Sequence, residues 1–175
     1  MSQMLIQILT HTPRWVFGLF LVLLALGVQQ LFTRQVTLRR VSLLPVVMTG
    51  LSVWGVISAF AMQPLALPAW MAGAVLAGGV LLQFPLPAGV RYDAASRRFQ
   101  LPGSAVPLAL MMGVFFTKYA VGVTLAQAPE LAFHGGFSLG LSALYGLFTG
   151  LFVGRAARLW RLAVGDAVTP HTVAA

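Results

Sequence analysis

The chain has no cysteine among its 175 residues. This absence excludes disulfides, thiolate catalysis, cysteine-ligated zinc or iron–sulfur clusters and thioether attachment of haem. Acidic residues are also scarce, because three Asp and Glu stand against eleven Lys and Arg. No nucleophile with a base, no paired carboxylates and no histidine-rich metal set can be assembled, so we expect neither an enzyme, nor a metal site, nor a cofactor.

Apolar residues are abundant: 59% of the chain is hydrophobic, 8% is charged, and the mean hydropathy is +0.90. A soluble domain carries about 25% charged residues. The arginines lie in short loops between apolar runs, which is typical of membrane topology rather than of a nucleic-acid surface. We therefore predict an integral membrane protein whose partner is the lipid bilayer, with no nucleic acid.

Five apolar stretches are long enough to cross a hydrocarbon core about 30 Å thick, which takes roughly 20 helical residues. We predict an all-α polytopic membrane protein, a single domain over residues 1–175 with a bundle of five transmembrane helices. The expected spans are residues 15–33, 42–62, 66–84, 105–126 and 130–154. A proline lies just before or within the first turns of each span, where its missing N–H costs little: Pro13, Pro45, Pro68, Pro107 and Pro129. Residues 2–12 are expected to form a short interfacial helix.

Arginines also orient these spans. They gather between the first and second spans, between the third and fourth, and after the fifth, whereas "AMQPLAL" and "LAQAPEL" contain no Lys or Arg. Cytoplasmic loops collect basic residues. The sequence therefore predicts a multi-pass protein of a bacterial inner (plasma) membrane, with the N-terminus outside and the C-terminus cytoplasmic.

The stretch "VRYDAASRRFQLPGS" between the third and fourth spans is polar. Two short extended pieces flank residues 93–96, and Pro102 and Gly103 follow, which predicts a short cytoplasmic hairpin or loop. Its basic residues Arg91, Arg97 and Arg98 are expected to contact anionic headgroups, and a specific anionic ligand is the alternative.

The fifth span has two different faces when drawn as a helix advancing 100° per residue. One face is polar and carries His134, Ser138, Ser142, Tyr145 and Thr149. Roughly opposite lies a helix-packing face of small residues: Gly136, Gly140, Gly146, Gly150 and Gly154. Packing within the monomer is favoured for the glycines over a homodimer seam. The polar face either forms hydrogen bonds between helices or lines a cavity.

The only lysine, Lys118, lies inside the fourth span, in "FFTKYAVG". Its ammonium group either reaches the outer headgroups along its own side chain or pairs with Glu130. In the second case Lys118, Tyr119, Glu130 and His134 would join the polar face of the fifth span in an outward-facing polar pocket.

Several stretches, taken together, resemble the CcdC-like proteins, a bacterial family of unassigned biochemical function. They are "RRVSLLPVVMTGLSVWG", "PAW", "FPLPAGVRYDAASRRFQLPGSAVPLALMMGVFFTKY" and "GLFVGRAARLW". On this resemblance Arg40, Pro45, Trp70, Lys118, Gly154 and Arg155 would match family positions. It implies an association with cytochrome c and thiol–disulfide biogenesis but no established activity, and a chain without cysteine cannot itself exchange thiols.

Three functions remain open on the sequence. The favoured one is an accessory or interaction protein that packs through its glycine-rich fifth helix against a membrane-protein partner or a second copy. The second is a small-solute or proton-coupled transporter, oligomeric and using the polar pocket, although no internal repeat is found. The third is a haem-binding subunit of a membrane redox system with His134 as ligand.

Overall fold

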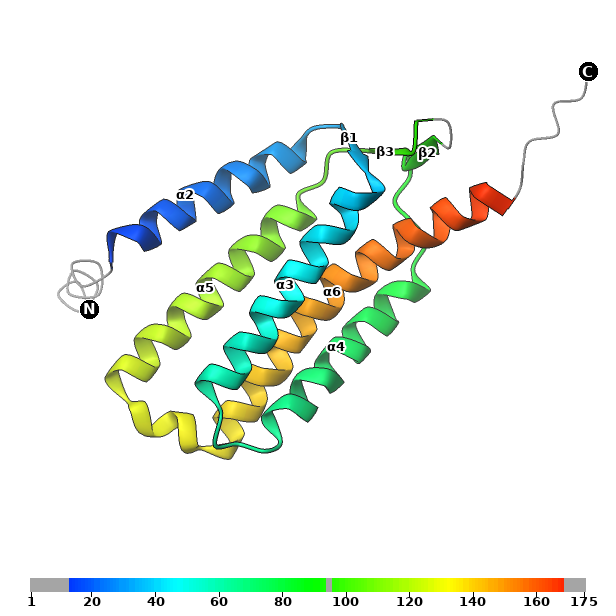
Figure 1. Ribbon diagram of the computed structural model, residues 1–175. Coiled ribbons are helices and arrows are strands. Elements are labelled where there is room, and N and C mark those ends of the chain that lie inside the picture. The colour runs from blue at the N-terminus through cyan, green and yellow to red at the C-terminus, as the bar shows by residue number, and fades with distance from the viewer. Residues whose placement is uncertain (1–12, 94–95, 169–175) are drawn as a thin grey trace, which may run out of the picture. The chain divides into compact units, whose positions relative to one another are not determined.

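The computed structural model describes residues 13–93 and 96–168 (Figure 1). The chain is mostly helical, and five segments are long and apolar enough to cross a membrane, as the sequence predicts. Their helices are α2 (Arg14–Val28), α3 (Leu38–Ala59), α4 (Ala66–Gln83), α5 (Val106–Gln127) and α6 (Gly135–Val168). The helix expected over residues 2–12 lies outside the described residues.

Shorter elements connect these helices. They are the 3₁₀ helices η1 (Gln29–Leu31) and η2 (Pro129–Phe133) and the strands β1 (Arg34–Thr37), β2 (Arg91–Asp93) and β3 (Arg98–Leu101). The chain divides into two compact units, and the single membrane domain stays a prediction. Unit 1 comprises Met1–Phe32 and Gly103–Glu130, and unit 2 comprises Thr33–Pro102 and Leu131–Ala175.

Unit 1 is built on the pairing of α2 with α5. The rings of Phe20 and Phe115 lie 5.3 Å apart between the two helices. Near η1 the backbone N–H of Ser104 donates a 2.9 Å hydrogen bond to the carbonyl of Gln30. A Cβ on Gly103 would overlap the carbonyl oxygen of Leu31, so glycine is required for this close approach.

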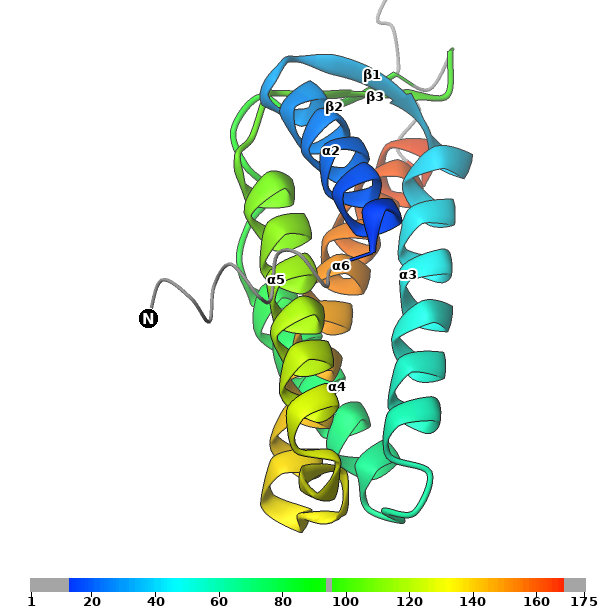
Figure 2. The ribbon, with the colours of Figure 1, turned by 90° about the vertical axis from the view of Figure 1, so that its left-hand side faces the viewer.

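Unit 2 contains α3, α4, α6 and all three strands. Helix α6 runs along α4 (Figure 1) and also contacts α3, which is seen along its length in Figure 2. Between these helices the indole N–H of Trp70 donates to the Ser52 hydroxyl at 3.0 Å. Ser52 in turn donates to the backbone carbonyl of Tyr145 at 3.4 Å. This chain of hydrogen bonds joins α4, α3 and α6.

The strands form one antiparallel sheet in the order β1-β3-β2. Strand β1 is an addition to the predicted fold, because residues 34–37 were expected to be a basic connection between spans. Its residues pair with β3, which is far away in the sequence. Such long-range pairing leaves no local pattern in a strand of four residues, so the all-α prediction misses it.

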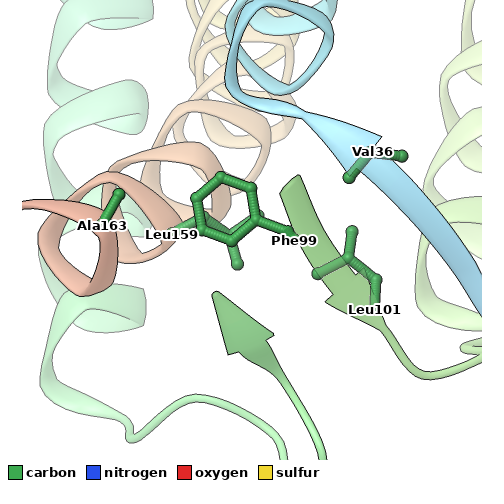
Figure 3. Packing of buried hydrophobic residues seen from close by; sticks show 5 residues of the cluster. All are labelled: Val36, Phe99, Leu101, Leu159 and Ala163. Carbon is green, nitrogen blue, oxygen red and sulfur yellow. The ribbon is translucent and has the colours of Figure 1, made fainter. Parts of the chain in front are cut away.

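The sheet packs against the C-terminal half of α6. On β3, Phe99 and Leu101 are buried while Arg98 and Gln100 are exposed, which is the alternation of a half-buried strand. Figure 3 shows the ring of Phe99 between the sheet and the helix, next to Leu159. This cluster, completed by Val36 and Ala163, explains why α6 continues beyond residue 154, where the fifth span was expected to end.

Two helix starts also differ from the prediction. Helix α3 begins directly after β1, so Arg39 lies in its first turn and Pro45 lies inside the helix rather than at its start. Helix α6 begins at Gly135, because Pro129 opens the separate turn η2. Glu130 and His134 therefore precede α6 and are not part of its first two turns.

Candidate functional site

The inner face of the sheet is apolar at one end and basic at the other. Arg34 and Val36 are two residues apart on β1, so their side chains leave the same face of the sheet. Val36 is buried in the cluster around Phe99, and the residue opposite Arg34 in the register is Leu101, also buried. The partly buried guanidinium of Arg34 is thereby turned to the side on which α6 lies.

Helix α6 brings a second guanidinium to the same place. Arg155 precedes Leu159 and Ala163 by one and two turns, so the three side chains share one stripe of the helix. Leu159 and Ala163 pack against the sheet. Arg155 is partly buried and lies close enough to Arg34 for the two positive charges to repel each other.

Two more arginines extend this group, and we call Arg34, Arg40, Arg155 and Arg158 the arginine cluster. Burial lowers the pKa of the Arg34 guanidinium, and the charge of Arg40 lowers it further. Arg158 lies within electrostatic reach of Arg155 and donates a hydrogen bond from Nη2 to the carbonyl of Pro85. Its Nε atom is buried, and no residue in the described part of the chain accepts a hydrogen bond from it.

The charge of unit 2 is not balanced within the chain. Nine arginines belong to this unit, against only two acidic residues, Asp93 and Asp166. Guanidinium groups present several N–H donors in a fork that matches carboxylate and phosphate oxygens. An arginine cluster of this kind, held in place by a folded sheet, is suited to binding an anion.

The sequence predicted anion contacts on the hairpin and not at this cluster. In the structure Arg91 and Arg98 are exposed on the outer face of the sheet, opposite to Phe99. Arg98 donates a 3.5 Å hydrogen bond to Gln35. Arg97 is also exposed and adopts a left-handed backbone with φ 52°. Headgroup contact by these three residues stays a prediction, separate from the cluster on the inner face.

Helix α4 packs against the second half of the glycine-rich face of α6. A Cβ on Gly146 would overlap the carbonyl oxygen of Trp70, and one on Gly150 would overlap that of Ala74. Gly154 approaches Gly78 so closely that an added Cβ would lie 3.2 Å from its Cα. By contrast, an added Cβ at Gly136 or Gly140 would meet no described atom within 4 Å.

The hydroxyl groups on the polar face of α6 bond mainly to the helix itself. Ser138 donates to the carbonyl of His134 at 3.1 Å, and Thr149 donates to that of Tyr145 at 2.9 Å. Ser142 is fully buried, and its hydroxyl has no hydrogen-bond partner among the described residues. Hydrogen bonds between helices come instead from Ser52, Trp70 and Trp160, none of which was a predicted site residue.

The residues of the predicted polar pocket belong to different units. Lys118, Tyr119 and Glu130 lie in unit 1, whereas His134 and the polar face of α6 lie in unit 2. Lys118 is more than two turns from Gln127, the last residue of α5, and Glu130 follows in η2. Their pairing, and the pocket itself, stay predictions. In the described part of the chain no group of three or more His, Asp or Glu side chains could hold a metal ion.

The fold and the cluster together describe a helical protein with five candidate membrane spans and a basic sheet packed on its longest helix. The chain belongs to the family of unknown function DUF6622, which matches residues 1–170. No curated protein and no solved structure gives a significant match. Nothing in these comparisons links the chain to the CcdC-like proteins, so that resemblance stays a prediction from the sequence.

Proposed function

We propose that the protein is a non-catalytic accessory protein of a bacterial inner membrane that binds phosphate-bearing groups through its arginine cluster. The observation that carries the proposal is the placement of Arg34 on the face of β1 that packs against α6 and of Arg155 on the α6 stripe that packs against the sheet. Like charges brought together by folding repel each other. A bound anion would offset that repulsion.

The proposal includes insertion of the five candidate spans with the N-terminus outside. In this orientation the loops that carry most of the arginines face the cytoplasm. The cytoplasmic leaflet contains anionic lipids, and polybasic segments near its surface are attracted to it. The arginine cluster would then lie at the level of phosphate groups, which supports phosphate over a carboxylate deep in the protein.

An interaction role also agrees with the use of the glycine-rich face. Gly146, Gly150 and Gly154 pack on α4 within the chain, so this part of the face is not free for a partner. We therefore propose that contact with a partner uses the basic end of unit 2, and not the glycines as the sequence suggested. It is part of the same proposal that this partner is a second copy of the chain or another membrane protein.

Two other functions have weaker support. A transporter would need a polar path, yet the hydroxyl groups of Ser138 and Thr149 donate to the carbonyls of Gly135 and Tyr145 in their own helix. A haem site would rest on His134, which is exposed just before α6 and whose backbone carbonyl accepts a hydrogen bond from the backbone N–H of Ser138 at the helix start. We place both behind the accessory role.

The test is a titration of the purified protein in a neutral detergent with dihexanoyl phosphatidylglycerol, and with dihexanoyl phosphatidylcholine as the neutral comparison. A ligand that binds only the folded state raises the unfolding free energy by about 2.7 kcal/mol at 100 times its Kd. We expect the anionic lipid alone to raise Tm. Arg155→Gln and Arg34→Gln should reduce the rise, whereas Arg14→Gln in unit 1 should keep it in full. Equal shifts with both lipids, or an unchanged shift in Arg155→Gln, would reject the proposal.

A further inference from the structure

A groove lies between the first turns of α3 and the C-terminal half of α6, apart from the arginine cluster. It has a volume of about 390 Å³ and is lined by Leu38, Arg39, Ser42, Leu43, Val46 and Trp160. This volume falls within the range of about 300–1,000 Å³ found for small-molecule sites. Apart from Arg39 and Ser42, the lining side chains are apolar or aromatic.

The polar atoms inside the groove are already paired. The indole N–H of Trp160 donates to the Ser42 hydroxyl at 2.9 Å. Ser42 donates to the carbonyl of Leu38 at 2.9 Å. These bonds fix the indole across the two helices and leave an apolar surface for an occupant. This part of the groove therefore favours a hydrocarbon.

The rim of the groove has the opposite character. Arg39 is exposed, and none of the described residues forms a hydrogen bond or an ion pair with it. It lies in the first turn of α3, which contains no acidic residue and whose N-cap Thr37 makes no side-chain cap hydrogen bond. A cation at this end of a helix is unfavourable with the helix dipole, whereas an anion beside it is stabilised. The rim therefore favours an anionic group.

The cationic rim and the apolar part of the groove are separated along α3. Seven residues, or about 10 Å at 1.5 Å per residue, separate Arg39 from Val46. Leu43 and Val46 are exposed by 63% and 69%. A molecule with an anionic head and a long apolar tail meets both ends, and the bilayer proposed around this chain supplies one.

We propose that this groove binds one anionic glycerophospholipid, with its phosphate at Arg39 and an acyl chain along Leu43 and Val46 against Trp160. The inference rests on the membrane insertion proposed above, and it assigns a lipid to a site separate from the arginine cluster. Basic pockets between membrane helices on the cytoplasmic side bind lipid headgroups in this way.

Trp160 is the natural reporter for this site, because brominated acyl chains quench indole fluorescence on contact. The probe protein is full-length and carries Trp15→Phe, Trp54→Phe and Trp70→Phe, which leaves Trp160 as its single tryptophan. It is reconstituted in bilayers containing equal fractions of brominated phosphatidylglycerol or brominated phosphatidylcholine. A matched chain that retains only Trp54, which is 72% exposed on α3, reports ordinary lipid contact.

We expect brominated phosphatidylglycerol to quench Trp160 at least several-fold more effectively than brominated phosphatidylcholine, with no such preference at Trp54. Arg39→Gln should abolish the preference, Val46→Phe should reduce quenching by either lipid, and Arg91→Gln should change nothing. Equal quenching of Trp160 by the two lipids, or a preference that survives Arg39→Gln, overturns the inference. Variants are compared only when their far-ultraviolet circular dichroism matches that of the parent chain. If Trp160 shows the lipid preference but short-chain lipid does not bind at Arg155, the proposed function alone is rejected. If short-chain lipid binds at Arg155 but Trp160 shows no preference, the groove alone is rejected.

Discussion

Arg34 on β1 and Arg155 on α6 approach each other closely enough for their positive charges to interact, although neither side chain is fully exposed. The register of β1 with β3 sets one position, and the packing of Leu159 against Phe99 sets the other. The apolar cluster therefore holds two like charges together. Such an arrangement costs free energy in the absence of a counter-ion.

The seam between α4 and α6 should be intolerant of side chains. Gly150→Ala places a methyl group on the carbonyl oxygen of Ala74, and overpacking of this kind costs about 1–3 kcal/mol. We expect a lower Tm in detergent. Gly140→Ala is the matched control, because an added Cβ there meets no described atom within 4 Å and alanine stabilises a helix by about 0.5–1 kcal/mol over glycine. Equal Tm values for the two variants would show that the seam is looser than described.

Phe99 should anchor the sheet to α6. It is fully buried, and truncation of a buried Phe to Ala costs about 3–5 kcal/mol. Phe99→Ala should therefore speed hydrogen exchange at the amides of β1 and β3. Phe84→Ala is the control, since Phe84 is 60% exposed in the same unit. If β1 amides exchange at the same rate in both variants, the sheet is held by other contacts.

The proposed orientation can be tested with single cysteines, because the natural chain has none. Ser96→Cys lies at the sheet, and Met62→Cys lies in the exposed connection between α3 and α4. In intact spheroplasts we expect a membrane-impermeant maleimide to label position 62 and to leave position 96 unmodified. Labelling should become equal once the membrane is permeabilised. The reverse pattern in intact cells would invert the topology.

The predicted pair of Lys118 and Glu130 has a direct test of its own. If the pair serves transport, Lys118→Ala and Glu130→Ala should each abolish solute-dependent proton flux in proteoliposomes and leave the fold intact. Lys118→Arg, which keeps the charge, is the control. If wild-type flux is present and persists in both alanine variants, the pair has no role in transport.

The sequence was sufficient for the helices but not for the sheet. Long apolar runs located all five candidate spans, because the period and length of such helices are local properties. Strand β1 and the arginine cluster depend on pairing between Val36 and Phe99 and on packing against Leu159, which are long-range. One local signal was available: Arg155 precedes Leu159 by four residues and so shares its buried stripe. The small residues around Gly150 predicted a close approach of helices without naming the neighbour, which in the structure is α4.

The most direct test of the arginine cluster compares the Tm of wild type and Arg155→Gln in two bilayers, one of zwitterionic lipid and one containing anionic phosphatidylglycerol. Without anions, removal of one charge relieves the repulsion of Arg34, so Arg155→Gln should melt at or above the wild type. In the bilayer with anionic lipid the wild type gains a bound counter-charge, so its Tm should exceed that of Arg155→Gln. Arg14→Gln should show the same offset from wild type in both bilayers. If Arg155→Gln also keeps one constant offset, the cluster does not bind anionic lipid and the central claim is contradicted.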